Sequence, residues 1–167
     1  MTLEQFNALA PEKAAEELTR CCGASRWVDI MLQCRPFRDK AALLKEAEDT
    51  WSLMAARDWL EAFEHHPRIG DKDALREKFA KTADWAAGEQ AGAAAADEAT
   101  LEALAAGNAE YEDKFGFIFI VCATGKSAKE MLALLNARLP NIQAAEMKLA
   151  AAEQNKITKL RLEKLLS

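Results

Sequence analysis

The amino-acid sequence predicts an all-α protein. Apolar residues recur at helical spacing through most of the chain. Capping residues and prolines stand where such segments begin or end, and alanine, which favours helix intrinsically, dominates residues 84–110. The chain has 167 residues, of which 50% are hydrophobic and 29% charged, a balance that suits one domain with one sizeable core. We therefore expect residues 1–167 to form a single-domain bundle of about eight helices, with one extended apolar segment near 115–123.

The first third of the chain carries a helix-start residue ahead of each apolar-periodic segment. Thr2 with Gln5 resembles a capping box, and Pro11 suits the first position of a helix. Ser25 and Asp39 are suited to cap the next two helices. The expected helices lie over residues 3–9 and 11–22, from residue 25 to Pro36, and from residue 39 past Met54 toward Phe63.

Both histidines of the chain are adjacent, in the stretch FEHHPRIGD at residues 63–71. Pro67 biases His66 toward an extended backbone, and histidine is the side chain whose ordinary pKa lies nearest neutral pH. His66 is therefore a candidate acid or base. We expect His65 to lie outside the site, because neighbouring residues of an extended backbone point in opposite directions. The alternative is an exposed loop with two solvated imidazoles.

Residues 115–123 (FGFIFIVCA) interrupt the helical pattern that resumes after the histidines. They are mostly aromatic and β-branched and so favour an extended backbone. The chain offers no comparable second run, and a lone strand forms no stable sheet. We therefore expect an extended ribbon wedged between helices, whose unused backbone N–H and C=O groups face a ligand. A buried helical segment is the alternative.

The last part of the chain predicts two helices. Ser127 is suited to cap the first, and Pro140 ends it. Arg161 lies at the edge of the apolar stripe of the second, over about residues 141–166, where an arginine needs a polar partner. The alternative for Arg161 is a surface side chain. The residues expected to point inward from this helix are Ile142, Ala145, Leu149, Ala152, Ile157 and Leu160.

Composition excludes several classes of partner. The net charge is −5 and there is no basic block, which argues against nucleic acid. No apolar run approaches the length of a membrane span, and the first residues lack the features of a signal peptide. We expect a cytoplasmic protein with four reduced cysteines. The usual zinc-ligand spacings are absent, so no metal site is expected.

Several motifs together resemble the family of OHCU decarboxylases, which act on 2-oxo-4-hydroxy-4-carboxy-5-ureidoimidazoline, an intermediate of urate breakdown. The resemblance extends over nearly the whole chain. For the fold it implies an all-α homodimer, and for the chemistry it implies no metal and no organic cofactor. The motifs that carry it are His65–Asp71, Glu89–Gly92, Asn108, Tyr111, Lys114–Phe117, Phe119–Ile120, Ala123, Gly125–Lys126, Arg138–Leu139, Glu153 and Ile157–Leu162.

The resemblance also implies roles for individual residues. His66 would be the proton donor in converting OHCU to (S)-allantoin and CO2, with Glu89 as its catalytic partner. Family members often have serine where this chain has Ala86, so a hydroxyl contact to the substrate would be missing there. The residues implied to bind the substrate are Pro67, Ala86, Gln90, Phe119, Ile120, Val121, Cys122, Ala123 and Arg161.

Two other readings of the sequence remain open. The alanine-rich helices would also suit a binding or assembly module without catalysis, which predicts an exposed apolar patch rather than a closed pocket. A helical hydrolase of purine intermediates would use the same histidine and glutamate. Product analysis separates this hydrolase from a decarboxylase, because only the decarboxylase releases CO2.

Overall fold

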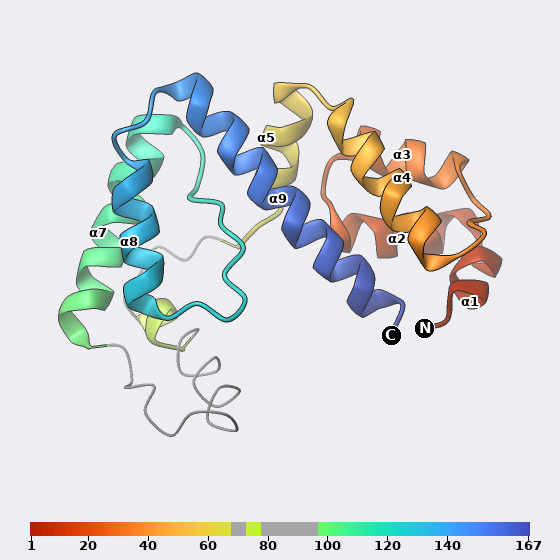
Figure 1. Ribbon diagram of the computed structural model, residues 1–167, viewed down its shortest axis with the longest axis horizontal. Helices are drawn as coiled ribbons and strands as arrows, with labels where there is room; N and C mark the ends of the chain where they lie inside the picture. The colour runs from red at the N-terminus through yellow and green to blue at the C-terminus, as the bar shows by residue number, and fades with distance from the viewer. Residues whose placement is uncertain (68–72, 78–96) are drawn as a thin grey trace. The chain divides into compact units, whose positions relative to one another are not determined.

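The computed structural model describes residues 1–67, 73–77 and 97–167, and every regular element with bounds inside these ranges is a helix (Figure 1). The described part contains no strand, so the all-α prediction is confirmed. None of the described helices is long and apolar enough to cross a membrane. The elements are α1 (Leu3–Ala8), α2 (Pro11–Cys21), α3 (Ser25–Gln33), α4 (Lys40–Ser52), α5 (Ala56–Glu64), α7 (Glu98–Phe115), α8 (Ala128–Arg138) and α9 (Gln143–Leu165).

The chain divides into two compact units. Unit 1 comprises Met1–His66 and Leu149–Ser167, and unit 2 comprises Pro67–Lys148. Helix α9 begins in unit 2 and ends in unit 1.

Helix α3 is the centre of unit 1, because it contacts α2, α4 and α5. Its Trp27 is fully buried, and the indole Nε1–H donates to the carbonyl of Ala47 on α4 at 3.1 Å. Trp51 of α4 makes the corresponding bond to the carbonyl of Ala151 on α9 at 2.9 Å. A buried indole needs such a partner for its N–H. These two bonds fix α4 against α3 and α9.

Most of the predicted helix starts are confirmed. Thr2 forms the capping box with Gln5, Pro11 opens α2, and the Asp39 side chain accepts from Ala42 N–H at 2.7 Å. The prediction for Ser25 is wrong, because it is the first residue of α3 and the cap is Ala24. Its amide and hydroxyl instead donate to Glu61 Oε2 of α5 at 3.1 and 3.0 Å, so Ser25 joins two helices rather than capping one.

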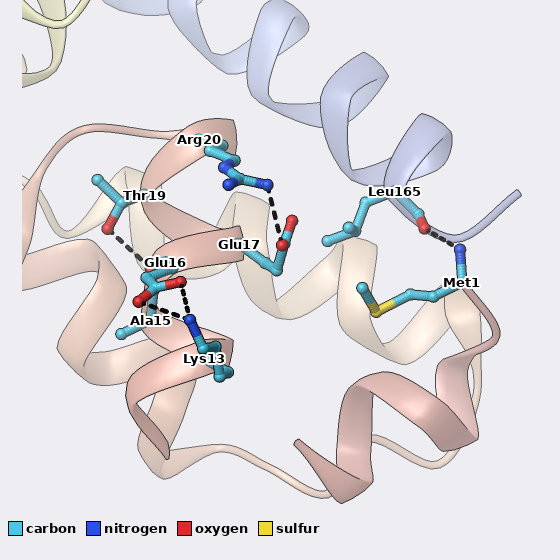
Figure 2. Close-up of polar contacts among 8 residues, drawn as sticks. All are labelled: Met1, Lys13, Ala15, Glu16, Glu17, Thr19, Arg20 and Leu165. Atoms are coloured by element: carbon cyan, nitrogen blue, oxygen red, sulfur yellow. Dashed lines mark hydrogen bonds and ion pairs between the residues drawn. The ribbon is translucent and has the colours of Figure 1, made fainter. Parts of the chain in front are cut away.

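The exposed face of α2 carries local polar contacts, shown in Figure 2. Lys13 pairs with Glu16, and Arg20 with Glu17, one helical turn apart at 2.9 and 3.0 Å. Such exposed pairs contribute little to stability. The same view shows the Met1 nitrogen donating to the Leu165 carbonyl at 2.8 Å, which joins the start of the chain to the last turn of α9.

The sequence pattern continues past Met54, but the helix does not. Helix α4 ends at Ser52 and α5 begins at Ala56. The carboxylate of Asp58 accepts from the Ala55 backbone N–H at 2.8 Å, which provides a polar start for a new helix. Asp58 is itself buried beside Arg26. The histidines that follow are therefore positioned by α5 and not by α4.

Unit 2 is built on α7 and α8, which lie side by side (Figure 1). Gly107 allows their close approach: a Cβ at this position would lie 2.6 Å from Leu135 Cδ2. Gly116 caps the end of α7, and its φ of 76° is readily adopted only by glycine. Residues 117–123 have no regular structure, and Ser127 then caps α8 with a capping box, as the sequence predicts.

A buried polar cluster holds unit 2 together. Glu146 of α9 is fully buried and accepts from Arg138 Nε at 2.6 Å, from Asn141 Nδ2 at 2.9 Å and from the Tyr111 hydroxyl. Burial, reinforced by the bond to this carboxylate, raises the pKa of Tyr111 and keeps its hydroxyl protonated as a donor. Arg138 also donates from Nη1 to the carbonyl of Ile120 at 2.7 Å.

The predicted inward face of α9 is wrong. Ile142, Leu149 and Leu160 are 72%, 44% and 41% exposed, and Ala145 and Ala152 are exposed as well, while Ile157 is half-buried. The side chains that are buried instead include three polar ones, and each of these has a hydrogen-bond partner, so their burial is tolerated. The buried residues are Glu146, Ala150, Ala151, Gln154, Thr158 and Leu162.

Replacing Arg138 by methionine should lower the free energy of unfolding by about 3–5 kcal/mol, because it leaves the buried Glu146 carboxylate without its cation. The matched control is Arg76→Met, which breaks the exposed pair with Glu98 and should cost about 1 kcal/mol or less. Urea denaturation of both variants measures the difference. Equal losses would show that the cluster around Glu146 does not depend on Arg138.

Candidate functional site

His66 lies just beyond the end of α5. Its backbone N–H donates to the carbonyl of Phe63 at 3.1 Å, which continues the last turn of the helix. The side chain is half-buried, and its Nε2 lies 2.5 Å from Oε1 of Gln154 on α9. Both residues belong to unit 1. His66 is therefore not one of two solvated imidazoles, because the protein fixes its ring.

The neighbouring His65 takes a different partner. It caps α5 with a right-handed helical backbone (φ −75°, ψ −6°), not the extended one that the sequence predicts. Its ring packs on the buried Gly23: a Cβ there would lie 2.2 Å from His65 Cγ. The two side chains thus take different partners, although both histidines follow Glu64, the last residue of α5.

Gln154 connects the His66 ring to a second buried side chain, that of Thr158. Its amide Nε2 donates to the hydroxyl of Thr158, one turn further along α9, at 3.1 Å, and both residues are buried. Burial raises the pKa of the Cys22 thiol to about 11 and outweighs the opposite effect of Thr158, so Cys22 remains a thiol at neutral pH.

Sequence reasoning missed Gln154 and Thr158, because it assigned the inward face of α9 to apolar residues. One signal was available. Gln154, Thr158 and Arg161 follow at intervals of four and three residues, which places them on one face of a helix. A polar row at this spacing indicates a buried hydrogen-bond network when partners from other elements face it.

Arg161 has a polar partner, as the sequence predicts. It is half-buried, and its Nη1 donates to the carbonyls of Arg20 and Cys21 at 3.2 and 3.4 Å. These are the last two residues of α2, where unpaired carbonyls favour a cation. The bonds orient the guanidinium, whose five N–H donors exceed those used here.

The ribbon at 119–123 is confirmed as a non-helical segment, and the buried-helix alternative is wrong. Phe115 belongs to α7, so the ribbon begins later than predicted. Ile120 is buried and the other four residues are half-buried. The guanidinium of Arg138 lies 4.7 Å from the centre of the Phe119 ring, in addition to its bond to the Ile120 carbonyl.

Protein donors already take three of the five ribbon carbonyls. Besides Ile120, the carbonyl of Cys122 accepts from Lys126 Nζ at 2.9 Å and that of Ala123 from the Lys126 N–H at 3.0 Å. The backbone groups engaged by Arg138 and Lys126 are therefore not among the unused ones that are expected to face a ligand. What the ribbon offers is a backbone whose position is fixed by Arg138 and Lys126.

Three predicted site residues, Ala86, Glu89 and Gln90, lie outside the described residues, as does the rest of the loop at 68–72. Of the others, the structure places His66 and Arg161 in unit 1 and Pro67, which is exposed, in unit 2 with the ribbon. Among the residues described, no three histidine, cysteine or acidic side chains gather as metal ligands would.

A model of the family described as OHCU decarboxylase matches residues 7–163 of the chain. The chain belongs to the OHCU decarboxylase family. The uric acid degradation bifunctional protein TTL of Arabidopsis thaliana is 39% identical over 163 residues, which are 95% of this chain and 49% of that protein. The chain thus spans about half the length of this curated relative.

Other members of the OHCU decarboxylase family correspond to the chain over most of their length. The 2-oxo-4-hydroxy-4-carboxy-5-ureidoimidazoline decarboxylase of Amia calva is 31% identical over 99% of this chain and 95% of its own. A crystal structure of an OHCU decarboxylase in the presence of (S)-allantoin superposes with a TM-score of 0.74 and 36% identity, covering 90% of this chain and 97% of that one. An (S)-allantoin synthase structure, with a TM-score of 0.73 but 16% identity, shares the fold.

Gly23→Ala should destabilise unit 1 by about 1–3 kcal/mol, because the added methyl group would overlap the Cβ and ring of His65. The double variant Gly23→Ala/His65→Gly removes the overlapping atoms and should lose less stability than the sum of the two single changes. Denaturant unfolding of the four proteins measures this coupling. Additive losses would mean that His65 does not pack on Gly23.

Proposed function

We propose that this chain catalyses the decarboxylation of OHCU to (S)-allantoin and CO2, a step of urate degradation. The observation that carries the proposal is the family match over residues 7–163. It is supported by the identity of 31% to a decarboxylase that the chain covers almost completely. It is also supported by the likeness to an OHCU decarboxylase whose structure was determined with (S)-allantoin.

The chemistry of the substrate limits what the protein must do. The name OHCU places a hydroxyl and a carboxyl group on one ring carbon, next to the carbon that carries the ureido group. When the C–C bond to the carboxylate breaks, the neighbouring C=N group takes up the electron pair and its nitrogen gains a proton, which leaves an enol. The enol oxygen then loses its proton while the ureido-bearing carbon gains one, and this last step sets the stereocentre of allantoin.

We assign the proton donor to His66. Proton delivery to one face of a planar enol requires an acid with a fixed direction, and the bond to Gln154 supplies that direction at a half-buried imidazole. A positioned acid of this kind typically contributes about 10²–10⁴-fold to the rate. Glu89 is proposed as the second catalytic residue, which holds substrate N–H groups or the imidazole tautomer.

The remaining residues are proposed to bind the substrate. The guanidinium of Arg161, oriented by two carbonyls at the end of α2, suits a planar carboxylate or ureido oxygen. The ribbon Phe119–Ala123 would contact the flat ring, with Pro67, Ala86 and Gln90 completing the site. Alanine at position 86 offers no hydroxyl, so any polar contact there would come from the backbone.

The cellular setting is part of the same proposal. The four cysteines, all within the described ranges, form no disulfide with one another, which suits a reducing cytoplasm. A single catalytic domain over residues 1–167 and a homodimeric assembly follow from the family resemblance. Gel filtration with light scattering tests the assembly.

His66→Gln should lower the rate of (S)-allantoin formation by about 10²–10⁴-fold, because glutamine keeps a polar side chain but cannot deliver an acidic proton. The measurement is circular dichroism during enzymatic urate oxidation and hydrolysis, in which spontaneous decay yields racemic product. His65→Gln is the matched control and should remain near wild type, since His65 packs on Gly23 instead of facing Gln154. Turnover by His66→Gln within a few-fold of wild type would exclude this role, and no stereoselectivity from the wild-type protein would overturn the proposed function.

Thiol labelling tests the ribbon as a substrate site. At neutral pH, iodoacetamide should modify the half-buried Cys122 but not Cys21 or Cys22, because burial raises the pKa values of these two thiols to about 12 and about 11. Saturating (S)-allantoin should slow labelling of Cys122. Cys34, a half-buried thiol beside Glu46 in unit 1, serves as the control. Equal protection of both cysteines, or of neither, would argue against binding at the ribbon.

A further inference from the structure

The hydrogen bond between His66 and Gln154 determines more than the direction of the ring. Gln154 has no exposed surface, so both ends of its amide need partners inside the protein. Its oxygen lies 2.5 Å from His66 Nε2, and its nitrogen lies 3.1 Å from the Thr158 hydroxyl. All three side chains belong to unit 1.

Thr158 fixes which way the amide points. The amide nitrogen can only donate, and the threonine oxygen accepts from it. The amide nitrogen is thus taken by Thr158, and the amide oxygen is the end that faces His66.

An amide oxygen can only accept, so the imidazole must donate from Nε2. This holds for the neutral ring and for the imidazolium alike, because both can carry a hydrogen on Nε2. The proton that distinguishes the two charge states is then the one on Nδ1. A hydrogen bond at one ring nitrogen commonly selects the tautomer in this way.

We propose that Gln154, held by Thr158, is a positioning residue that keeps His66 protonated on Nε2, so that the proton delivered to the substrate is the one on Nδ1. The proposal rests on the proposed function for the role of that proton. The assignment of the tautomer rests on the two hydrogen bonds of the Gln154 amide. Gln154 itself does not touch the reacting atoms in this scheme.

The tautomer can be observed directly by nitrogen NMR. The chain has two histidines, so His65→Gln leaves only His66 to observe. In the neutral ring we expect the ¹⁵N shift of a protonated Nε2 and of an unprotonated Nδ1. Gln154→Met, similar in length but without an acceptor oxygen, should lose this preference, whereas Gln154→Glu, which keeps an acceptor, should retain it. A wild-type ring protonated on Nδ1, or an unchanged tautomer in Gln154→Met, would overturn the proposal.

Turnover provides the second measurement. Gln154→Met should lower kcat by about 10–100-fold with KM changed less than about threefold, because a misdirected acid impairs proton transfer but not binding. Thr158→Val keeps the side-chain shape but removes the hydroxyl that orients the amide, and should lower kcat in the same direction. Circular dichroism spectra and melting curves establish that each variant is folded.

The outcomes distinguish this proposal from the function on which it rests. Wild-type kcat in a folded Gln154→Met variant would overturn the positioning role and leave the decarboxylase in place. An inactive wild-type protein would overturn the proposed function, and with it the delivery of the Nδ1 proton. An equal loss of kcat and rise in KM in Gln154→Met, with the tautomer unchanged, would make Gln154 a structural residue and overturn the proposal.

Discussion

The hydrogen bond from His66 to Gln154 is the constraint on which the candidate site depends. It joins the end of α5 to α9 within unit 1. Its direction depends in turn on Thr158, because a buried amide adopts whichever orientation satisfies both of its ends. His65, the residue that precedes His66, packs on Gly23. The position of His66 therefore results from packing on one side and from a polar network on the other.

Much of the fold could be predicted because its determinants are local. The capping boxes at Thr2 and Ser127 and the cap at Asp39 depend on residues within one turn, and the departure from helical spacing after Phe115 indicated the ribbon. The break between α4 and α5 could not be predicted in this way. It depends on Asp58, a carboxylate in α5 whose bond to the Ala55 N–H competes with continuation of the helix.

The candidate site was predictable only in part. His66 and Arg161 were identified through their residue types and family motifs, and the structure gives both of them fixed partners. Gln154 and Thr158 were missed because periodicity measures hydrophobicity, whereas α9 buries polar side chains whose partners come from distant parts of the chain. Leu149 and Leu160 were assigned inward by the same rule and are exposed. A polar residue can be recognised as buried only when its hydrogen-bond partners are known.

The buried polar groups of α9 are not the most stabilising choice for a helix core. Replacing a buried ion pair such as Arg138–Glu146 by apolar side chains of similar volume is often neutral or stabilising, and alanine or leucine would fit the helix better than threonine. What these groups provide is direction. Arg138 fixes the Ile120 carbonyl of the ribbon, and Gln154 fixes the ring of His66. Stereoselective protonation of a flat intermediate depends on where a donor points, so a protein with this task gains more from directed hydrogen bonds than from additional apolar burial.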